Sequence, residues 1–302
     1  MLRAVGSEAG RPPIPLFERL VLESHSYCNR ACWFCPRTYD RSGKYLDAAR
    51  EPVVARMPTE KVLSLMDEAV ALGFQGPVGF HHYSEPLLDD RHLTFAREAR
   101  ARGLQPDLHT NGDVLLDDAP LCDEVTQAFD AVVVGLYDYR TDDELAEAQR
   151  FWSRRLAGTH LSFSPIGPQG TRSGHSVGAP RATVPTNPRT SIPDLTYPNA
   201  PCHRPLLRMI IQYDGEMCQC CDDTMGAFGL GSVYEHSLEA LWYSDRHVST
   251  VAALVDGQRA DYGLCRVCPM PPTAPRPDGV PIDMRPRRMA RDDHSRITEV
   301  TQ

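Results

Sequence analysis

Three cysteines in one short loop constrain this chain more than any other feature. Cys28, Cys32 and Cys35 lie in the run Ser-Tyr-Cys-Asn-Arg-Ala-Cys-Trp-Phe-Cys-Pro-Arg, which follows an apolar, strand-like segment. Thiolates are the usual ligands of iron–sulfur clusters, and three of them can bind three irons of a 4Fe–4S cubane. The next cysteine is Cys122, far along the sequence. Because structural metal sites are normally closed by four protein ligands, the loop predicts an open position where a small molecule binds.

Zinc is the main alternative at this loop. His25 is close enough in sequence to supply a fourth ligand beside the three cysteines. Zinc sites usually contain C-x2-C pairs, however, and the first spacing here is C-x3-C. The spacing therefore favours an iron–sulfur cluster over zinc, and over three simply buried thiols.

Composition limits the class of protein and its partners. The chain has 302 residues, 41% of them hydrophobic, which is enough for one large domain and a smaller one. A formal net charge of −8 disfavours a nucleic-acid partner, because phosphate binding needs clustered Lys and Arg. No apolar run approaches the ~20 residues that span a bilayer, and residues 1–15 contain no hydrophobic signal segment. We expect a cytoplasmic protein without a membrane partner, whose ten cysteines bind metal rather than form disulfides.

Strands and helices alternate over the first half of the chain. Strands are predicted at 19–24, 77–83, 104–108, 131–136 and 161–164, and helices at 60–72 (with Thr59 as its cap), 89–102, 121–128 and 142–156. Such alternation predicts an α/β fold with a parallel sheet wound by right-handed crossovers. Enzymes of this kind place their chemistry at the carboxyl ends of the strands, and the cysteine loop follows such an end.

The second half of the chain has a different character. Residues 166–201 are rich in Gly, Pro, Ser, Thr and Arg and show no periodicity, which predicts a linker or an active-site loop. Six of the remaining seven cysteines fall between Cys202 and Cys268, which predicts a second, metal-organised domain. The predicted organisation is an N-terminal extension (1–18), a barrel domain (19–165), the linker or loop (166–201), a cysteine-rich domain (202–270) and a tail (271–302).

The cysteines of the second domain can be grouped in more than one way. Cys218 and Cys221 form one C-x2-C pair, and Cys265 and Cys268 form another. Two such pairs also make a common zinc-ribbon pattern. The sequence leaves open which of Cys218, Cys220 and Cys221 joins the later pair.

Four segments of the barrel domain and the linker together resemble the radical S-adenosylmethionine (SAM) enzymes. They are the cysteine loop, Tyr83-Ser84-Glu85-Pro86, Thr110-Asn111-Gly112 and the Thr-Arg-Ser-Gly run at Arg172. The resemblance implies a partial (β/α)6 TIM-like barrel and a cluster held by the three loop cysteines, with SAM on the open iron. It also implies these cofactor contacts: Phe34 near the adenine, Ser84 and Glu85 at the methionine ammonium, Thr110 and Asn111 at the ribose or methionine moiety, and Arg172 at the carboxylate. Tyr83-Ser84 replaces the family's two glycines, so backbone contacts there are the least secure part of the resemblance.

The second domain resembles the SPASM/twitch auxiliary domain of the same enzymes. Cys202, Gly215 and Cys220 follow that domain's order, and Cys265 and Cys268 supply its closing C-x2-C pair. The resemblance implies that these four cysteines hold one auxiliary 4Fe–4S cluster. Because no cysteine follows Cys268, the one-cluster twitch form fits better than a full SPASM domain. Asp214-Gly215 separately predicts a hairpin turn.

Some residues are candidates for a direct role in catalysis. A cysteine close to a radical can donate a hydrogen atom, so Cys218, Cys221 and Cys122 are candidates, although a small buried cysteine is a common core residue. His81 and His82 would alternate faces in a strand, and one of them, His82 by preference, could act as a base. Tyr137 has a similar position at the end of the valine-rich strand.

The resemblance implies an enzyme with two 4Fe–4S clusters and SAM. Twitch-domain relatives include the 2-deoxy-scyllo-inosamine dehydrogenase of the butirosin pathway and aminoglycoside epimerases. We therefore expect a 5′-deoxyadenosyl radical to abstract hydrogen from a small polyhydroxylated substrate (a sugar, an aminocyclitol or an antibiotic intermediate), which leads to dehydrogenation or epimerisation. A flavodoxin- or ferredoxin-type protein is the expected electron donor. The alternatives are a peptide-modifying maturase and, more remotely, a zinc-bound module without enzymatic activity.

Overall fold

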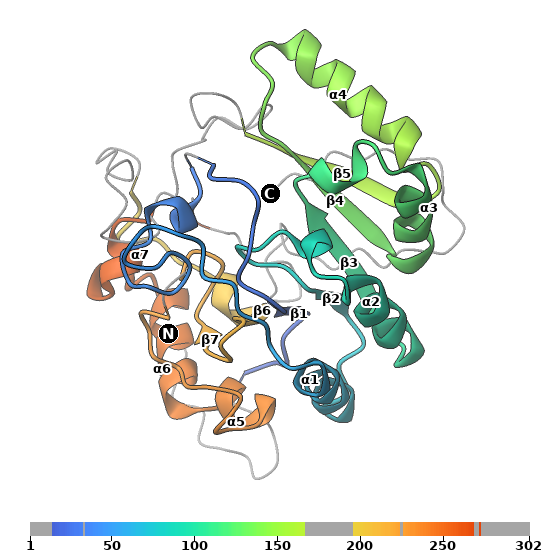
Figure 1. Ribbon diagram of the computed structural model, residues 1–302. Coiled ribbons are helices and arrows are strands. Elements are labelled where there is room, and N and C mark those ends of the chain that lie inside the picture. Colours follow the sequence, from blue (N-terminus) through green and yellow to red (C-terminus); the bar gives the residue numbers. More distant parts are fainter. Residues whose placement is uncertain (1–13, 33, 167–195, 224–225, 269–271, 273–302) are drawn as a thin grey trace.

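The computed structural model describes residues 14–32, 34–166, 196–223, 226–268 and 272. Within them, one seven-stranded sheet has the order β5-β4-β3-β2-β1-β6-β7 (Figure 1). Neighbouring strands pair in parallel from β5 across to β6, and β7 is antiparallel to β6. The strands are β1 (Arg19–Leu22), β2 (Pro77–Gly79), β3 (Gln105–Thr110), β4 (Ala131–Leu136), β5 (His160–Pro165), β6 (Arg208–Ile211) and β7 (Met217–Cys218).

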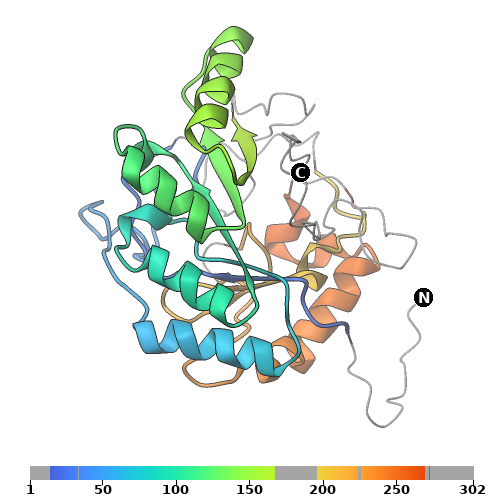
Figure 2. The same ribbon diagram turned by 90° about the vertical axis from the view of Figure 1, so that its right-hand side faces the viewer.

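Four helices connect the first five strands and follow one another along one side of the sheet (Figure 2). They are α1 (Thr59–Ala71), α2 (His92–Ala101), α3 (Ala119–Ala128) and α4 (Asp142–Arg155). The predicted α/β class with a partial barrel is confirmed. Five strands form the consecutive series, and the sixth parallel strand, β6, comes from beyond residue 196 and joins the opposite edge at β1.

The start of α1 differs from the prediction. Thr59 was expected to cap this helix from outside, but the N-cap residue is Pro58 and no side chain caps it. The Thr59 hydroxyl instead accepts a hydrogen bond from Arg91 Nη1 at 3.1 Å. Thr59 is therefore the first residue of the helix rather than its cap, and its hydroxyl bonds to a side chain of another segment.

Strand β2 is shorter than the predicted 77–83 and ends at Gly79. Beyond that point the backbone bonds to other partners. The Phe80 carbonyl is 3.1 Å from His92 Nε2, Tyr83 N donates to the Glu23 carboxylate at 2.8 Å, and Glu85 N donates to the Tyr27 carbonyl at 3.0 Å. The segment after β2 therefore leaves the strand ladder and enters the region where the cysteine loop lies.

The two faces of the sheet differ sharply in polarity. Alternate residues of each strand point to opposite faces. The face toward α1–α4 packs into one large apolar core, represented by Leu20, Leu22, Leu108, Val132 and Phe163. The residues that alternate with them line the inner face. They are mainly polar outside β4: Arg19, Val21 and Glu23 on or just after β1, Gly79 and His81 on or just after β2, Asp107 and His109 on β3, Ser162 and Ser164 on β5, and Arg208, Ile210 and Gln212 on or just after β6, whereas β4 contributes Ala131, Val133 and Gly135.

The hairpin expected at Asp214-Gly215 is confirmed. Strands β6 and β7 pair antiparallel, with Ile210 opposite Cys218, and Gly215 adopts a φ of 87° that favours glycine. The hairpin extends the sheet beyond β1, so residues from the cysteine-rich half of the chain form part of the same inner face.

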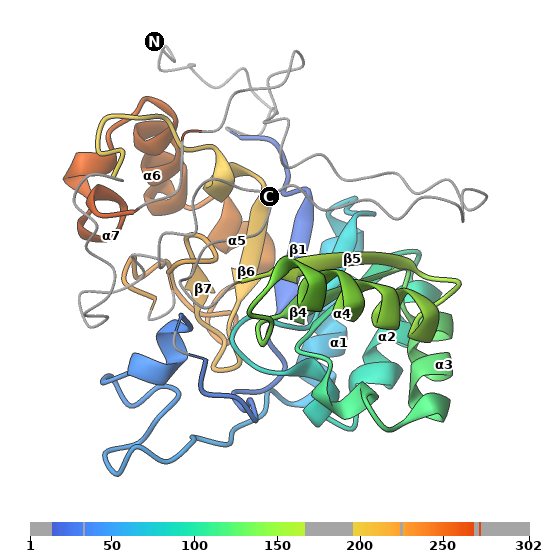
Figure 3. The same ribbon diagram turned by 90° about the horizontal axis from the view of Figure 1, so that it is seen from above.

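Short helices after the hairpin pack against the start of the barrel (Figure 3). Trp242 Nε1 donates to the Pro15 carbonyl at 3.0 Å, its ring contacts Phe17 edge-on at 5.3 Å, and Leu238 N donates to Glu68 on α1 at 2.9 Å. These helices are α5 (Leu238–Trp242), α6 (Asp245–Val255) and α7 (Gly263–Arg266). No helix in the described residues is both long and apolar enough to cross a membrane.

Candidate cofactor and substrate site

The cysteine loop lies at the carboxyl end of β1 and is held by its own hydrogen bonds. Thr38 Oγ1 donates to the Cys32 carbonyl at 2.8 Å, and Cys35 N donates to the same carbonyl at 3.0 Å. Arg37 Nη1 donates to the Cys28 carbonyl at 3.1 Å. None of the three cysteines forms a disulfide, and all three are partly exposed.

The three thiols lie within electrostatic reach of one another. Burial first, and then the neighbouring Cys35 and Cys28, raise the pKa of Cys32 to about 12. Two donors face the sulfur of Cys28: the backbone N–H of Arg30 at 3.5 Å and Asn111 Nδ2 at 3.9 Å. Hydrogen bonds to sulfur are one of the means by which proteins tune iron–sulfur clusters.

Glu85 joins the cysteine loop region to the end of β3. Its carboxylate accepts hydrogen bonds from Thr110 Oγ1 at 2.6 Å, Asn111 N at 2.7 Å and Leu87 N at 3.3 Å. Burial raises the pKa of Glu85 to about 7, and these donors oppose the rise. The structure thus brings together Glu85, Thr110 and Asn111, three residues that the sequence predicted to contact SAM.

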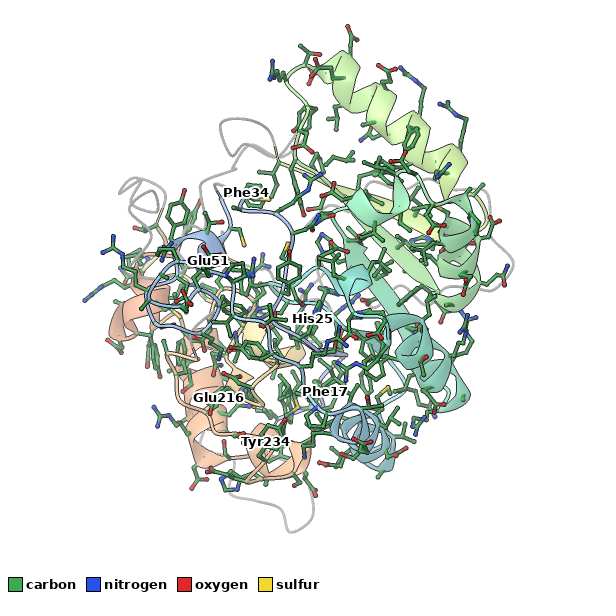
Figure 4. All side chains as sticks on the ribbon, viewed as in Figure 1. Phe17, His25, Phe34, Glu51, Glu216 and Tyr234 are labelled. Atoms are coloured by element: carbon green, nitrogen blue, oxygen red, sulfur yellow. The ribbon has the colours of Figure 1, made fainter. Side chains whose placement is uncertain are left out.

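The other side of the loop is tied to the ends of β3 and β4. Arg30 forms an ion pair with Asp113, and its Nη1 lies 2.8 Å from Asp138 Oδ2. The rings of Phe34 and Tyr137 meet edge-on with centroids 4.9 Å apart. In Figure 4 Phe34 lies on this loop, away from Phe17 at the amino end of β1.

Tyr137 folds back over the inner face of the sheet. A side chain at Gly135 would clash with the Tyr137 hydroxyl and ring. The glycine therefore makes room for this ring beside Phe34. Phe34 and Tyr137, which the sequence singled out for different roles, are thus neighbours at the same end of the sheet.

Two further predicted cofactor contacts have different outcomes. Ser84 is buried beside Glu85, and its Oγ has no hydrogen-bond partner within the described residues. A buried hydroxyl without a partner is a place where a bound polar group can form a hydrogen bond. Arg172 lies outside the described residues, as does most of the predicted loop 166–201.

The second cysteine set is assembled from distant parts of the chain. Cys202 N donates to the Leu254 carbonyl at the end of α6 at 2.8 Å, and Cys268 N donates to the Cys265 carbonyl at 3.2 Å. Burial raises the pKa of Cys265, and Cys268 and Cys202 raise it further. After burial, Asp222, Cys221 and Cys265 raise the pKa of Cys220. Cys202, Cys220, Cys221, Cys265 and Cys268 are therefore electrostatically connected, and which four of them hold a cluster stays a prediction.

Cys218 lies elsewhere. It is fully buried on β7, packs with Val21 and Ile210 on the inner face, and has Cys221 against this cluster. Burial raises its pKa well above the ordinary value, and Asp223 and Glu23 are among the charged groups that raise it further. Cys122, in contrast, is buried in the core on the helix side of the sheet, where its Sγ lies 3.5 Å from the Leu115 carbonyl.

A buried network around Glu23 links the two cysteine-bearing regions. Glu23 accepts hydrogen bonds from Tyr45 Oη at 2.8 Å, Tyr83 N at 2.8 Å and Tyr213 N at 3.4 Å. The Tyr83 hydroxyl donates to the Cys221 carbonyl, and Gln212 Nε2 donates to the Tyr45 hydroxyl at 2.9 Å. No sequence pattern singled out Glu23. An acidic residue that ends an apolar strand was the available signal.

The donor chemistry of both cysteine sets fits iron–sulfur clusters. No cysteine of either set forms a disulfide, and all of them are partly exposed. Thiolates are the ligands that such clusters need. The raised pKa values of Cys32 and Cys265 keep these thiols protonated before a cluster binds, so binding would displace their protons. Within the described ranges, no three His, Cys, Asp or Glu side chains converge closely enough to hold a single metal ion.

This chain is similar to known iron–sulfur and SAM-dependent proteins. The SPASM iron–sulfur cluster-binding domain family matches residues 202–269. The S-adenosyl-L-methionine-dependent 2-deoxy-scyllo-inosamine dehydrogenase of Niallia circulans is 24% identical over 262 residues, which cover 84% of this chain and 93% of that protein.

Solved structures share the fold. The crystal structure of BtrN in complex with AdoMet and 2-DOIA superposes with a TM-score of 0.62 at 21% identity, covering 84% of this chain and 94% of that one. A structure of anSMEcpe with bound AdoMet and the Cp18Cys peptide gives 0.50 at 13% identity, covering 84% and 88%. The resemblance to radical SAM enzymes with a SPASM/twitch-type domain, predicted from the sequence, is confirmed by these matches.

Proposed function

We propose that this protein is a radical SAM dehydrogenase that oxidises a carbinol carbon of a small polyhydroxylated substrate, such as an aminocyclitol, in antibiotic biosynthesis. One observation carries the proposal. The partly exposed cysteine loop stands at the carboxyl ends of the strands, tied to Glu85, Thr110 and Asn111, at one end of a polar sheet face. The Niallia circulans dehydrogenase, similar over most of both chains, supports the same reaction class.

The chain's own residues have defined roles in this proposal. Cys28, Cys32 and Cys35 would hold the first cluster, and Cys202, Cys220, Cys265 and Cys268 the second. Bound together with SAM, the first cluster supplies a carbon-centred radical by reducing SAM, and the second supplies a place for an electron. Glu85 and Ser84 would orient the methionine end of SAM, Thr110 and Asn111 would fix its position, and Phe34 and Tyr137 would flank the adenine and keep water away.

The inner face favours a small polar substrate. Glu23, His81, Asp107, His109 and Gln212 all lie on it, and Asp107 Oδ1 is buried without a hydrogen-bond partner in the described part of the chain. Hydroxyl and ammonium groups satisfy such atoms, whereas apolar peptide side chains leave them unpaired at a cost of roughly 1–3 kcal/mol each. This polarity supports a polyol or amino-polyol over a peptide, and the peptide-modifying alternative has the weaker support.

Epimerisation is the second candidate function, because one observation favours it. Cys218 lies on the inner face, away from the cysteines grouped around Cys265. A thiol there is positioned on the substrate side of the sheet, where it could return a hydrogen atom to the opposite face of a substrate radical. Turnover in deuterium oxide separates the two outcomes: epimerisation retains solvent deuterium at carbon and stalls in Cys218→Ala, whereas dehydrogenation does neither.

Anaerobic reconstitution tests the proposed function directly. The full chain is loaded with iron and sulfide, reduced with dithionite and incubated with SAM and 2-deoxy-scyllo-inosamine. We expect about eight irons per chain, release of 5′-deoxyadenosine and a ketone product. Stoichiometric zinc with no 5′-deoxyadenosine would contradict the radical reaction and favour the zinc-bound module. Reduction by a flavodoxin or ferredoxin in place of dithionite tests the proposed electron donor.

A further inference from the structure

Four residues on the inner face form a compact group that the proposed cofactor contacts do not use. Gly79 and Asp107 are paired partners on the neighbouring strands β2 and β3. His81 follows Gly79 by two residues on the same face, and Arg19, at the start of β1, forms an ion pair with Asp107 Oδ2. The other carboxylate oxygen, Oδ1, lies 3.9 Å from His81 Nδ1. Neither of these two facing atoms has a hydrogen-bond partner within the described residues, and both are buried.

Gly79 is what allows this approach. A Cβ built on Gly79 would lie 2.6 Å from Asp107 Oδ1, 2.7 Å from His81 Cε1 and 2.9 Å from His81 Nδ1. Real Cβ atoms essentially never come this close to other heavy atoms. Glycine within a strand often marks a place where another group must come close. Here it lets an imidazole and a carboxylate share the space that a side chain would otherwise fill.

The orientation of the ring follows from the same contacts. Its Nδ1–Cε1 edge lies against Gly79 and Asp107, while the His81 side chain keeps 20% of its surface exposed. Nε2 is the other nitrogen bonded to Cε1, and unlike Nδ1 it is not among the buried side-chain atoms without a hydrogen-bond partner in the described residues. A histidine with one nitrogen directed at a carboxylate and the other left accessible has the arrangement of a general base and its orienting partner. Such hydrogen bonds are often long without substrate and tighten when it binds.

The charges around His81 keep the ring neutral and able to accept a proton. Burial holds its pKa well below the ordinary value, and four neighbouring groups lower it further: His109, Arg19, His82 and Arg208. His109, on β3, is nearest among the rings, with centroids 5.3 Å apart. Asp107 is the acidic group that faces Nδ1. A proton taken at Nε2 would leave an imidazolium whose Nδ1–H points at this carboxylate, which favours the protonated ring at that moment.

We propose that His81 is the base that accepts the hydroxyl proton of the substrate, and that Asp107, Arg19 and Gly79 position it. The inference rests on the proposed dehydrogenation. In that reaction the carbinol C–H hydrogen leaves as an atom to the SAM-derived radical, and the O–H hydrogen leaves as a proton to His81 Nε2. The second cysteine set would hold the iron–sulfur group that takes up the one remaining electron, and the C–O bond becomes a C=O bond. Hydrogen abstraction does not need the base, but ketone formation does.

Separate measurement of these two steps tests the proposal. The probe is 2-deoxy-scyllo-inosamine that carries deuterium on its carbinol carbons, and the reconstituted full chain is the enzyme. For His81→Gln we expect deuterium transfer into 5′-deoxyadenosine within about 3-fold of wild type, while ketone formation falls by about 100-fold or more. In His81→Ala, added imidazole should restore ketone formation at least about 10-fold. A fall in both readouts together, no fall in ketone, or no rescue by imidazole overturns the assignment.

The positioning residues have a matched test. Gly79→Ala should keep deuterium transfer and iron content but lower ketone formation by about 10-fold, because the methyl group separates His81 from Asp107. Asp107→Asn should show the same split. Gln127→Ala is the control, since Gln127 is exposed and lies on α3, on the helix side of the sheet. Unchanged ketone formation in Gly79→Ala and Asp107→Asn overturns the positioning roles.

Failure of the proposed function would look different. If the wild-type protein cleaves SAM but takes no deuterium from the probe and makes no ketone, the proposed dehydrogenation is overturned, and the base with it. If wild type makes ketone and the variants do not separate the two steps, only the inference about His81 fails.

Discussion

The two cysteine sites of this protein are built from the chain in opposite ways. The first draws Cys28, Cys32 and Cys35 from one loop, which is held by hydrogen bonds among its own residues. The second draws on residues from 202 to 268 and depends on α6, α7 and the β6–β7 hairpin to bring them together. The first site can be recognised from spacing alone, whereas the membership of the second is decided only by the fold.

The largest effect is expected when the first cysteine site, in the loop that contains Cys28, is removed. Cys28→Ala should reduce SAM cleavage by at least about 1,000-fold, because the remaining two thiols cannot retain a cluster with one open iron. Chromatographic measurement of 5′-deoxyadenosine checks this. Cys122→Ala is the control, since this cysteine is buried in the core on the helix side of the sheet. Comparable loss in both variants would show that the first loop has no special role.

Loss of the second cysteine site should impair ketone formation much more than SAM cleavage. In Cys265→Ala we expect iron content to fall by about half while SAM cleavage stays within about 10-fold of wild type, and ketone formation to fall by at least about 100-fold. Iron analysis and both product assays on one preparation separate these effects. A variant that keeps all its iron would remove Cys265 from the ligand set.

The Glu23 network connects the two regions, and its stability effect should be of intermediate size. Burial raises the pKa of Glu23 from 4.5 to about 7, so the folded state prefers the neutral acid and this contribution to stability is lost as the pH rises through 7. Between pH 5.5 and 8, the free energy of unfolding of wild type should fall by about 2 kcal/mol relative to Glu23→Gln. Urea unfolding of both proteins at the two pH values measures the difference. Parallel pH dependence would show that Glu23 is ionised in both states.

The smallest effect is expected for Cys218. Because it lies apart from the group around Cys265, Cys218→Ala should keep its full iron content and lose only about 1 kcal/mol of stability from the buried sulfur. Iron analysis beside Cys220→Ala, which should lose about half its iron, decides between the two thiols. Iron loss in Cys218→Ala instead would show that Cys218 is a cluster ligand, contrary to the proposal that Cys220 has this role.

Sequence patterns predicted the features that depend on local order. The alternation of strand-like and helix-like segments predicted the parallel sheet. The strand predicted at 131–136 matches β4, because β-branched valines favour strands. The resemblance to radical SAM enzymes implied that Glu85, Thr110 and Asn111 contact one cofactor, and the structure brings these three residues together. These contacts follow from the rule that parallel strands end at one edge of a sheet.

Features that depend on pairing between distant strands could not be predicted in the same way. The strand expected to reach Tyr83 ends at Gly79, because the backbone of Tyr83 bonds to the Glu23 side chain. The approach of His81 to Asp107 requires the register between β2 and β3, which neither segment reveals alone. The sequence favoured His82 as the base. The structure instead favours His81, and the assay with deuterium-labelled substrate tests that choice.

The position of β6 beside β1 has a consequence for the way the protein is made. On the ribosome, β1 and the first cysteine loop emerge early, but the strand that covers the free edge of β1 emerges only after the long segment that follows β5. Until then a nascent chain presents an open, apolar strand edge of the kind that invites aggregation. A first cluster loaded before synthesis ends would be held by a sheet that still lacks β6 and β7. We therefore expect delivery of iron and sulfide to follow release of the finished chain.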